Sequence, residues 1–560
     1  MKTILNISLV LGFVIMAVSC DDFLDVNTDP NSATSAELKK LLSNAQVETA
    51  FSVSQRYYLG SELSVFVHHN NVREDANRYA SPAEAGGYGN SWTSFYAGSL
   101  ATYAEIIKEG EVQKNWDFVG IAKILKVYIA MNMVDFWGDI PFFEAADVGN
   151  TQYPKVDKGE EVYSACFTIL KEAKDHFKET GSDVNLIQPG SADIIYGGDT
   201  DKWTALANTL MLRMCNNTRN VKTRIAGWDA WLAEAVAGPR IDAAMDFQFP
   251  FSGSQSPTDE RYIAYTHCYG ATQHTNYPSP WLYEIMNGYI EYNMPGNPFG
   301  SIVDPRIPYY FYNQAAPDEE VAASSFRDGG FISIFFGDNS AAGSANQTSY
   351  ATVWGLYPVG GKYDTGDART VTQTDGAQGK TVQKMFTCAD LKFIEAEMML
   401  DGTIAGNAGD ALSTAIRAAF IHLNNTGKGL GGAPAAGIAA ADIDAYVDAV
   451  MRKYDAATST ARKLEIILTQ KWIHDVMNPF ESYTDIRRTG YPILFDADSP
   501  GYGITPQLAD GTAATGSDAR MNTYCSRPYP NSLWYPRNEV DRNPNMTQKA
   551  SQAVKVFWQQ

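Results

Sequence analysis

The sequence predicts a mainly α-helical protein, in which stacked helical hairpins of the tetratricopeptide type carry an irregular, loop-rich subdomain with short strands. Two observations support this fold class. Apolar residues recur every three or four positions in successive segments of about 15 to 20 residues, with loops between them. From residue 250 to 375 this periodicity fades, and 22 of the 126 residues are aromatic, compared with 12% of the whole chain. No strict repeat signature is visible, so the hairpin prediction depends on periodicity.

Composition indicates a globular chain with a substantial core. Hydrophobic residues make up 45% and charged residues 19% of the 560 residues, enough chain for one very large domain or three ordinary ones. The 44 Lys and Arg residues against 64 Asp and Glu residues give a formal net charge of −20. Such a chain lacks the positive charge that binds nucleic acid phosphates, so general nucleic acid binding is not expected.

The N-terminus predicts a secretory signal. Lys2 precedes an apolar run from Ile4 to Val18, which is too short for a comfortable transmembrane span. Ala17-Val18-Ser19-Cys20 resembles a bacterial lipobox, although Ala17 stands where Leu is usual, and Cys20 is then the lipidated first residue of the mature protein. The alternative is a plain signal peptide with an unmodified cysteine. No other stretch is apolar enough to span a bilayer, so we expect a soluble body on a lipid tether.

The remaining cysteines predict neither a zinc site nor a disulfide framework. They are odd in number, far apart and never spaced as Cys-x-x-Cys. We expect most of them to be small buried hydrophobic side chains. They are Cys166, Cys215, Cys268, Cys388 and Cys525.

The helix at the centre of the predicted scaffold runs within residues 115–145. Phe118, Ile121, Leu125 and other apolar residues at spacings of three and four predict one apolar face. Gly138 is a natural helix end and Pro141 prevents continuation. We expect the aromatic residues at this end to be scaffold core.

Further helices are predicted on both sides of the irregular region. Before it, helical patterns run over residues 35–66, 92–109 and 160–180, and another starts at Asp199 or Thr200. After it, helical patterns run over residues 384–400, 408–423, 443–454 and 460–477. Residues 68–90 read as a loop between two of the first helices. Arg487 and Arg488 are expected to bond carboxylates or helix ends.

The common catalytic motifs are absent from the sequence. It contains no His-Glu-x-x-His zinc motif and no Gly-x-Ser-x-Gly nucleophile elbow. Gly379-Lys380-Thr381 is no phosphate loop, because Thr374 stands where that motif requires glycine. The histidines show no metal-ligand spacing, so neither metal nor cofactor is predicted. A glycoside hydrolase needs only two carboxylates at a set separation, and it remains an alternative function.

Five stretches in the same order resemble the SusD/RagB family of outer-membrane lipoproteins, in particular its SusD-like branch. Individually each is a weak signal, but together they are specific and span nearly the whole mature chain. They are CDDFLDVNTDPN from Cys20, DFWGDIPFFEA from Asp135, DKWTALANTLMLR from Asp201, the segment from Glu465 through Lys471-Trp472 to DIRRTGYP at Asp485, and YPRNEV from Tyr535.

The resemblance implies an architecture and a role. The fold is a tetratricopeptide-like scaffold at about 35–249 and 380–490, an aromatic insertion at about 250–379 and a C-terminal loop segment at 491–560. Together these form one domain over 20–560, after a signal peptide at 1–19. Family members lie on the outer surface of Bacteroidetes cells and deliver nutrients, usually oligosaccharides and sometimes peptides, to a SusC-like TonB-dependent transporter that they cap as a lid. Asp21 and Asp22 resemble the acidic surface-export signal of such lipoproteins. No catalysis is implied.

Aromatic side chains in loops suit sugar binding, because a flat ring packs on the C–H face of a sugar while polar groups bond its hydroxyls. The family's binding residues lie in variable loops, so the site is predicted from composition. We expect two groups of ligand-binding residues, although most single aromatic residues in such a subdomain serve as core. The first group is Arg73, Asn77, Tyr79 and Tyr88, and the second is Tyr269, Tyr277, Trp281, Trp354 and Tyr357. The expected ligand is an oligosaccharide, with a peptide as the alternative.

Overall fold

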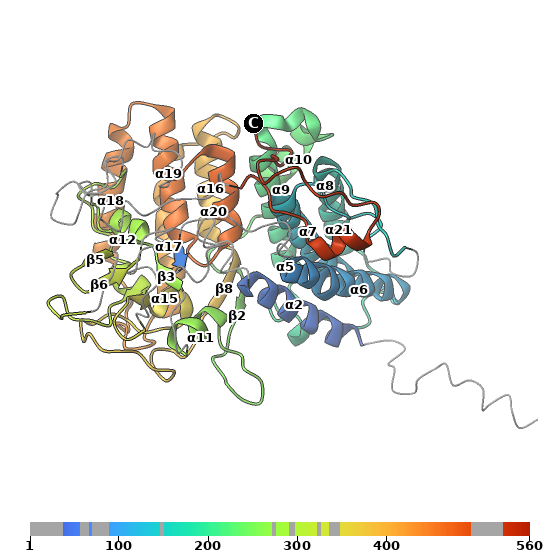
Figure 1. The fold of residues 1–560 in the computed structure, drawn as a ribbon. Coiled ribbons are helices and arrows are strands. Elements are labelled where there is room, and N and C mark those ends of the chain that lie inside the picture. The colour runs from blue at the N-terminus through green and yellow to red at the C-terminus, as the bar shows by residue number, and fades with distance from the viewer. Residues whose placement is uncertain are drawn as a thin grey trace, which may run out of the picture.

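The computed structural model confirms a mainly helical fold with loop-rich regions and short strands. It describes residues 37–55, 66–69, 89–145, 151–270, 276–289, 297–321, 326–334, 348–493 and 530–560. Figure 1 shows two groups of helices side by side: α2 to α10 with α21 on the right, and α11 to α20 with most strands on the left. Among the described helices, none is both long and apolar enough to span a bilayer.

The first group contains the predicted helices before the irregular region. Its elements are α2 (Leu38–Gln55), α5 (Gly89–Thr93), the π-helix η3 (Ser94–Leu100), α6 (Ala101–Val112), α7 (Trp116–Trp137), α8 (Gly159–His176), the 3₁₀ turn η4 (Gly190–Ala192), α9 (Thr200–Thr218), the 3₁₀ turn η5 (Arg219–Arg224) and α10 (Trp228–Ala237). Neighbours along the chain pack together, since α7 contacts both α6 and α8, and α9 contacts α8 and α10. Asp199 caps α9 by accepting from the N–H groups of Asp201 and Lys202.

Helix α7 is buried on all sides, whereas the sequence pattern predicted one buried face. Of its 22 residues, 19 are buried, including Asp117, Asn132 and Asp135. The reason is its central position, because α2, α6, α8, α9 and α20 all contact it. The predicted end is confirmed: Gly138 has φ +75°, which favours glycine, and its N–H donates to Val134 O at 2.7 Å. Phe136 and Trp137 are core residues, as expected.

Where the structure describes it, the irregular region consists of short helices and of strands that pair into four two-stranded sheets. The antiparallel strand pairs are β1 (Val67–His69) with β3 (Asn276–Pro278), β2 (Phe247–Pro250) with β8 (Val382–Phe386), β4 (Phe311–Tyr312) with β7 (Val353–Trp354), and β5 (Phe326–Asp328) with β6 (Phe331–Ser333). The short helices are α11 (Ile263–Tyr269), α12 (Pro280–Met286), α13 (Ile307–Tyr310) and α15 (Leu356–Val359).

The remaining helices follow the irregular region, and several of their ends differ from prediction by two to four residues. They are α16 (Cys388–Leu400), α17 (Ala408–Gly427), α18 (Ala440–Ala456), α19 (Thr460–His474), α20 (Pro479–Thr489) and α21 (Arg537–Arg542). The predicted helix at 384–400 begins only at Cys388, because residues 382–386 pair with β2 as strand β8. Thr387 then caps α16, and its side chain and that of Asp390 bond each other's backbone N–H groups in a capping box.

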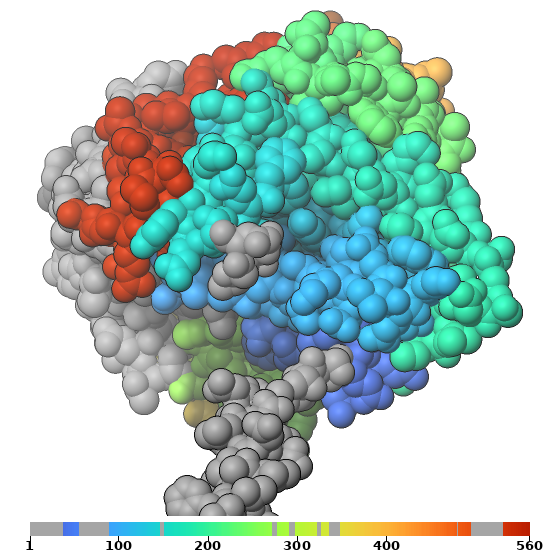
Figure 2. All heavy atoms as spheres, turned by 90° about the vertical axis from the view of Figure 1, so that its right-hand side faces the viewer, coloured from blue at the N-terminus to red at the C-terminus, as the bar shows by residue number. Residues whose placement is uncertain are grey.

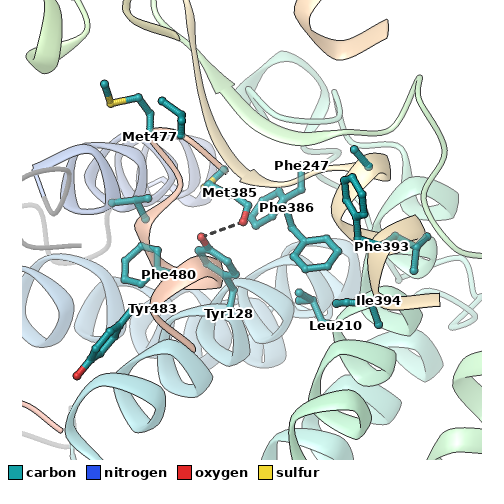
Figure 3. Close-up of a cluster of buried hydrophobic side chains, with 14 of the residues drawn as sticks. Tyr128, Leu210, Phe247, Met385, Phe386, Phe393, Ile394, Met477, Phe480 and Tyr483 are labelled. Carbon is teal, nitrogen blue, oxygen red and sulfur yellow. Dashed lines mark hydrogen bonds between the residues drawn. The ribbon is translucent and has the colours of Figure 1, made fainter. Parts of the chain in front are cut away.

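A cluster of buried hydrophobic side chains joins the two helix groups. Figure 3 shows Tyr128 of α7 and Leu210 of α9 facing Phe247 of β2, Phe386 of β8 and residues of α16 and α20. The hydroxyl of Tyr128 donates to Met385 O at 3.4 Å across this cluster. The β2–β8 sheet therefore lies where the two groups meet, and it ties the irregular region to both.

The C-terminal segment returns to the end of α7. Trp137 Nε1 donates to Trp534 O at 3.1 Å, and the hydroxyl of Tyr535 donates to Asp139 O at 2.6 Å. Figure 2 shows this segment (red) on the surface beside the chain that follows α7 (cyan). Here Asn543 donates to Pro154 O at 2.8 Å.

The cysteine and arginine predictions agree with the structure. Cys166, Cys215, Cys268 and Cys388 are buried, and Cys525 lies outside the described residues, as does Cys20. Arg488 bonds the carboxylates of Glu397 and Asp485, and Arg487 donates to the carbonyls of Tyr483 and Asn531. Arg488 thus has the expected carboxylate partners, whereas Arg487 bonds backbone carbonyls, one inside α20 and one in the C-terminal segment.

Candidate ligand-binding site

The β1–β3 sheet pairs the residues just before the first predicted group with a strand that contains Tyr277 of the second group. His68 of β1 lies opposite Tyr277 of β3, and the N–H of Ser279 donates to Phe66 O at 2.9 Å just beyond the sheet. Strand β1 ends at His69, so the segment that carries the first group starts next to a residue of the second group. Backbone pairing therefore joins two strands that are about 200 residues apart in the sequence.

The first group itself, Arg73, Asn77, Tyr79 and Tyr88, lies outside the described residues. Both flanks of this segment are fixed to the scaffold by aromatic contacts. On one side, the ring of Phe66 stacks on Trp472 of α19 with centroids 5.0 Å apart. On the other side, Trp92 meets Trp137 of α7 edge to face at 5.5 Å. Phe66 and Trp92, on either side of this segment, are thus each packed against a scaffold helix.

The second group lies in the interior. The exposed fractions are 4% for Tyr269, 0% for Tyr277, 3% for Trp281, 0% for Trp354 and 2% for Tyr357. In the described conformation these rings are packed among protein side chains, as a hydrophobic core requires. Direct ligand contact by these five residues stays a prediction, and their packing suits the support of a binding surface.

Trp354 and Tyr269 show how this support is built. The Trp354 ring stacks on Phe311, the residue opposite it in the β4–β7 sheet, with centroids 5.9 Å apart. The hydroxyl of Tyr269 donates to Trp354 O at 3.0 Å and accepts from the N–H of Lys362 at 2.7 Å. One phenol therefore links α11, β7 and the chain after α15.

Tyr357 belongs to a buried polar group beneath the irregular region. Its hydroxyl accepts from Lys384 Nζ at 2.9 Å and lies 3.4 Å from His422 Nδ1. Burial, the largest cause, lowers the pKa of Lys384 to about 8, and burial also lowers the pKa of His422, to about 3. At neutral pH the imidazole is uncharged, and the ammonium of Lys384 is the local positive charge.

The structure adds a polar aromatic edge that the sequence prediction missed. The hydroxyls of Tyr283 and Tyr289 both donate to Asp328 Oδ2, at 2.8 and 2.7 Å, and all three residues are half-buried. Burial and then the carboxylate of Asp328 raise the pKa of Tyr283, so its hydroxyl stays a donor. The Tyr283 ring stacks on Phe331 with centroids 3.8 Å apart, which fixes α12 on the β5–β6 hairpin.

A sequence signal for this edge existed. Asp328 is followed by Gly329 and Gly330, and Asp-Gly between short apolar runs is typical of a tight hairpin turn. Gly329 has φ +54°, as such turns require. Sequence gives the hairpin, but the meeting of its aspartate with two tyrosines of another segment depends on tertiary packing.

A surface cavity of about 250 Å³ lies between the irregular region and the turn from α18 to α19. It is lined by Pro298, Lys453, Thr458, Arg462 and Ile466, with two alanines. Figure 1 places α12, α18, β5 and β6 on the same side of the molecule. None of the lining residues is a carboxylate, histidine or cysteine, so this cavity holds no acid–base pair of its own.

Comparison with known proteins identifies the family of this chain. A family model described as "Starch-binding associating with outer membrane", SusD-like, matches residues 30–506. No protein with a curated description matches the sequence.

Solved structures share the fold at low sequence identity. A SusD homolog from Bacteroides uniformis is 20% identical with a TM-score of 0.64, and the match covers 93% of this chain and 99% of that one. A chitin-binding SusD homolog from Flavobacterium johnsoniae is 20% identical with a TM-score of 0.62, covering 93% and 98%. A SusD homolog from Bacteroides fragilis is 17% identical with a TM-score of 0.61, covering 91% and 94%.

Proposed function

Because the chain belongs to the SusD-like family, we propose that it is a nutrient-binding lipoprotein of the outer membrane that binds an oligosaccharide on the cell surface without chemical change. Lipidation of Cys20 anchors it, and a SusC-like TonB-dependent transporter receives the ligand while the protein caps it as a lid. In this proposal residues 20–560 form one domain, with the binding surface on the insertion at about 250–379.

The observation that carries the proposal is the β1–β3 sheet with the Tyr283–Tyr289–Asp328 edge. Sugars are recognised by a few fixed polar groups beside flat apolar surface, and preorganised groups cost less entropy on binding. Two tyrosines whose hydroxyls are already fixed on one carboxylate provide such a surface. The proposal also assigns Arg73, Asn77, Tyr79 and Tyr88 to the site, because residue 70 directly follows strand β1.

The family description names starch, and the structural neighbour from Flavobacterium johnsoniae is described as chitin-binding. Starch and chitin are both polymers of hexose rings, so both offer the C–H faces that aromatic rings contact. The proposal is therefore committed to a carbohydrate, with these two polymers as the first ligands to test.

The test is binding and turnover in one preparation. The purified protein is run through native gels that contain starch, soluble chitin or no polymer, and is applied to arrays of oligosaccharides and of peptides. We expect retardation by at least one glycan, and recovery of that glycan with unchanged chain length after prolonged incubation. Peptide binding without glycan binding would contradict the proposed ligand, and shortened glycan products would indicate a hydrolase.

A further inference from the structure

Three buried side chains with metal-binding groups meet where α16, α19 and α20 come together. Asp390 lies in the first turn of α16, His474 ends α19, and Asp475 follows it. Their exposed fractions are 0%, 1% and 1%. One oxygen of each carboxylate and one ring nitrogen of His474 lie within 4.8 Å of one another. We call these three residues the Asp-His-Asp cluster.

Each carboxylate in the cluster accepts from N–H or hydroxyl donors through one oxygen only. Asp390 Oδ2 accepts from Thr387 N at 2.7 Å and from Thr387 Oγ1 at 2.8 Å, and Asp475 Oδ2 accepts from Ser482 Oγ at 3.2 Å. In the described part of the chain, no N–H or hydroxyl group donates to Asp390 Oδ1 or Asp475 Oδ1. The two carboxyl groups bond each other when Asp475 is protonated, and burial, followed by the Asp390 carboxylate, raises the pKa of Asp475. A buried carboxylate oxygen left in this state is costly, so a positive group between the two oxygens would be strongly stabilising.

The imidazole of His474 places one ring nitrogen, Nε2, near the open oxygen of Asp390. Its Nε2 lies 2.8 Å from Thr387 Oγ1, and that hydroxyl already gives its hydrogen to Asp390. Without an ion, Nε2 therefore donates to Thr387. The same nitrogen lies 3.9 Å from Asp390 Oδ1, so an ion bound through Nε2 requires the neutral ring to carry its hydrogen on Nδ1. Metal-binding histidines are commonly held by a hydrogen bond from the second ring nitrogen, and their carboxylate neighbours by bonds to the second oxygen.

The cationic side chains nearby are bonded to other groups. Lys384 Nζ donates to Tyr357 Oη at 2.9 Å and to the backbone carbonyl of His474. Lys471 Nζ bonds Glu481 and Asp485, at 3.0 and 2.7 Å. Within the described residues, neither ammonium group bonds Oδ1 of Asp390 or Asp475, which leaves both oxygens for another cation.

We propose that the Asp-His-Asp cluster binds one divalent transition-metal ion of the Zn²⁺ type, which connects α16 to the junction of α19 and α20. Imidazole nitrogen and carboxylate oxygen are donors that Zn²⁺ binds at about 2.0–2.2 Å. Tetrahedral ligands at that bond length lie about 3.4 Å apart, so small side-chain movements complete the site. Because the cluster is buried, the ion enters while the protein folds. The role is structural and independent of the proposed function.

The first test measures metal in the protein as purified without chelators. Elemental analysis should find about one Zn²⁺ or a similar transition metal per chain. The protein is then unfolded in denaturant with a chelator and refolded with Zn²⁺, Mn²⁺, Ca²⁺, Mg²⁺ or no metal. We expect Zn²⁺ to raise the melting temperature by at least 5 °C and Ca²⁺ or Mg²⁺ to leave it within 1 °C of the metal-free value.

Two variants locate the ion. Asp475→Asn should lower the bound metal at least tenfold. The control is Asp246→Asn, because Asp246 is a neighbouring carboxylate that accepts from Cys388 N at 2.7 Å, a bond that asparagine keeps. This control should bind as much metal as the unchanged protein. If Asp475→Asn does not fold, the metal content and the refolding series of the unchanged protein decide.

Two results would overturn the proposal. The first is that the purified protein contains no metal and that Zn²⁺ changes neither its refolding nor its melting temperature. In that case a melting temperature of Asp475→Asn at or above that of the parent would indicate that the two carboxylates share a proton. The other is equal metal content in the parent and Asp475→Asn, which would place the ion on other acidic groups of this highly acidic chain.

Discussion

Arg213 of α9 and Glu481 of α20 form a fully buried ion pair between residues that lie 268 positions apart in the chain. The same guanidinium bonds Asp135 of α7, with Nη1 3.1 Å from Oδ2. Glu481 in turn bonds Lys471 of α19 at 3.0 Å. One arginine therefore connects helices from both ends of the sequence, and the stretches that carry the family resemblance contain all four residues.

Replacement of this arginine should be severely destabilising. In Arg213→Met, Asp135 and Glu481 stay buried and lose their shared cation, and breaking a buried ion pair in this way typically costs about 3–5 kcal/mol. We expect that loss in the free energy of unfolding, measured by urea denaturation. The control is Arg537→Met, because Arg537 forms an exposed pair with Asp541 at 3.0 Å, and such pairs contribute about 0–1 kcal/mol. Equal losses in both variants would contradict the role given to Arg213.

Buried Lys549 in the C-terminal segment should make the stability of the protein depend on pH. Lys549 Nζ donates to Trp137 O at 2.5 Å and Leu533 O at 2.6 Å, and burial, the largest cause, lowers the pKa of Lys549 to about 7. In the unfolded chain a lysine has a pKa of about 10.4. Between these values the unfolded state binds more protons, so the free energy of unfolding rises with pH.

Measurement of the unfolding free energy from pH 7 to pH 10 tests this expectation. As the pH rises, the free energy of unfolding of the unchanged protein should increase by up to about 1.4 kcal/mol per pH unit relative to that of Lys549→Met, because methionine has no titratable group. Lys555→Met serves as the matched control, because Lys555 is exposed in the same segment. If the difference between parent and Lys549→Met stays flat over this range, Lys549 does not titrate near pH 7.

Most of the scaffold follows from local sequence, and the site does not. Helix α9 was predicted from Asp199 because a cap and an apolar stripe are local features. The strand at residues 382–386 was missed, because its extended form depends on pairing with β2. Similarly, Trp354 has the composition of a sugar-stacking residue, but its contact with Phe311 is set by tertiary packing. A count of aromatic residues in the sequence cannot show which of them are buried.

The Tyr283–Tyr289–Asp328 edge gives a prediction about ligand affinity. In Asp328→Ala both tyrosine hydroxyls lose the carboxylate that fixes them, so the preorganised surface becomes mobile. We expect the dissociation constant for the bound glycan to rise about tenfold, which corresponds to about 1.4 kcal/mol. Isothermal titration calorimetry measures it, with the exposed Asp318→Ala as control. Unchanged affinity in folded Asp328→Ala would remove this edge from the proposed site.

The Trp354→Ala variant distinguishes two possible roles of Trp354, which are supporting the binding surface and contacting the ligand directly. Its ring is fully buried on Phe311, so Trp354→Ala should lower the free energy of unfolding by about 3–5 kcal/mol. Affinity of the remaining folded protein for the glycan should change less than in Asp328→Ala. Tyr363→Ala is the matched control, because this half-buried ring meets Tyr309 edge to face at 4.8 Å and should cost less stability. Loss of glycan binding in Trp354→Ala at unchanged stability would instead make Trp354 a ligand contact, because a supporting residue acts only through the fold.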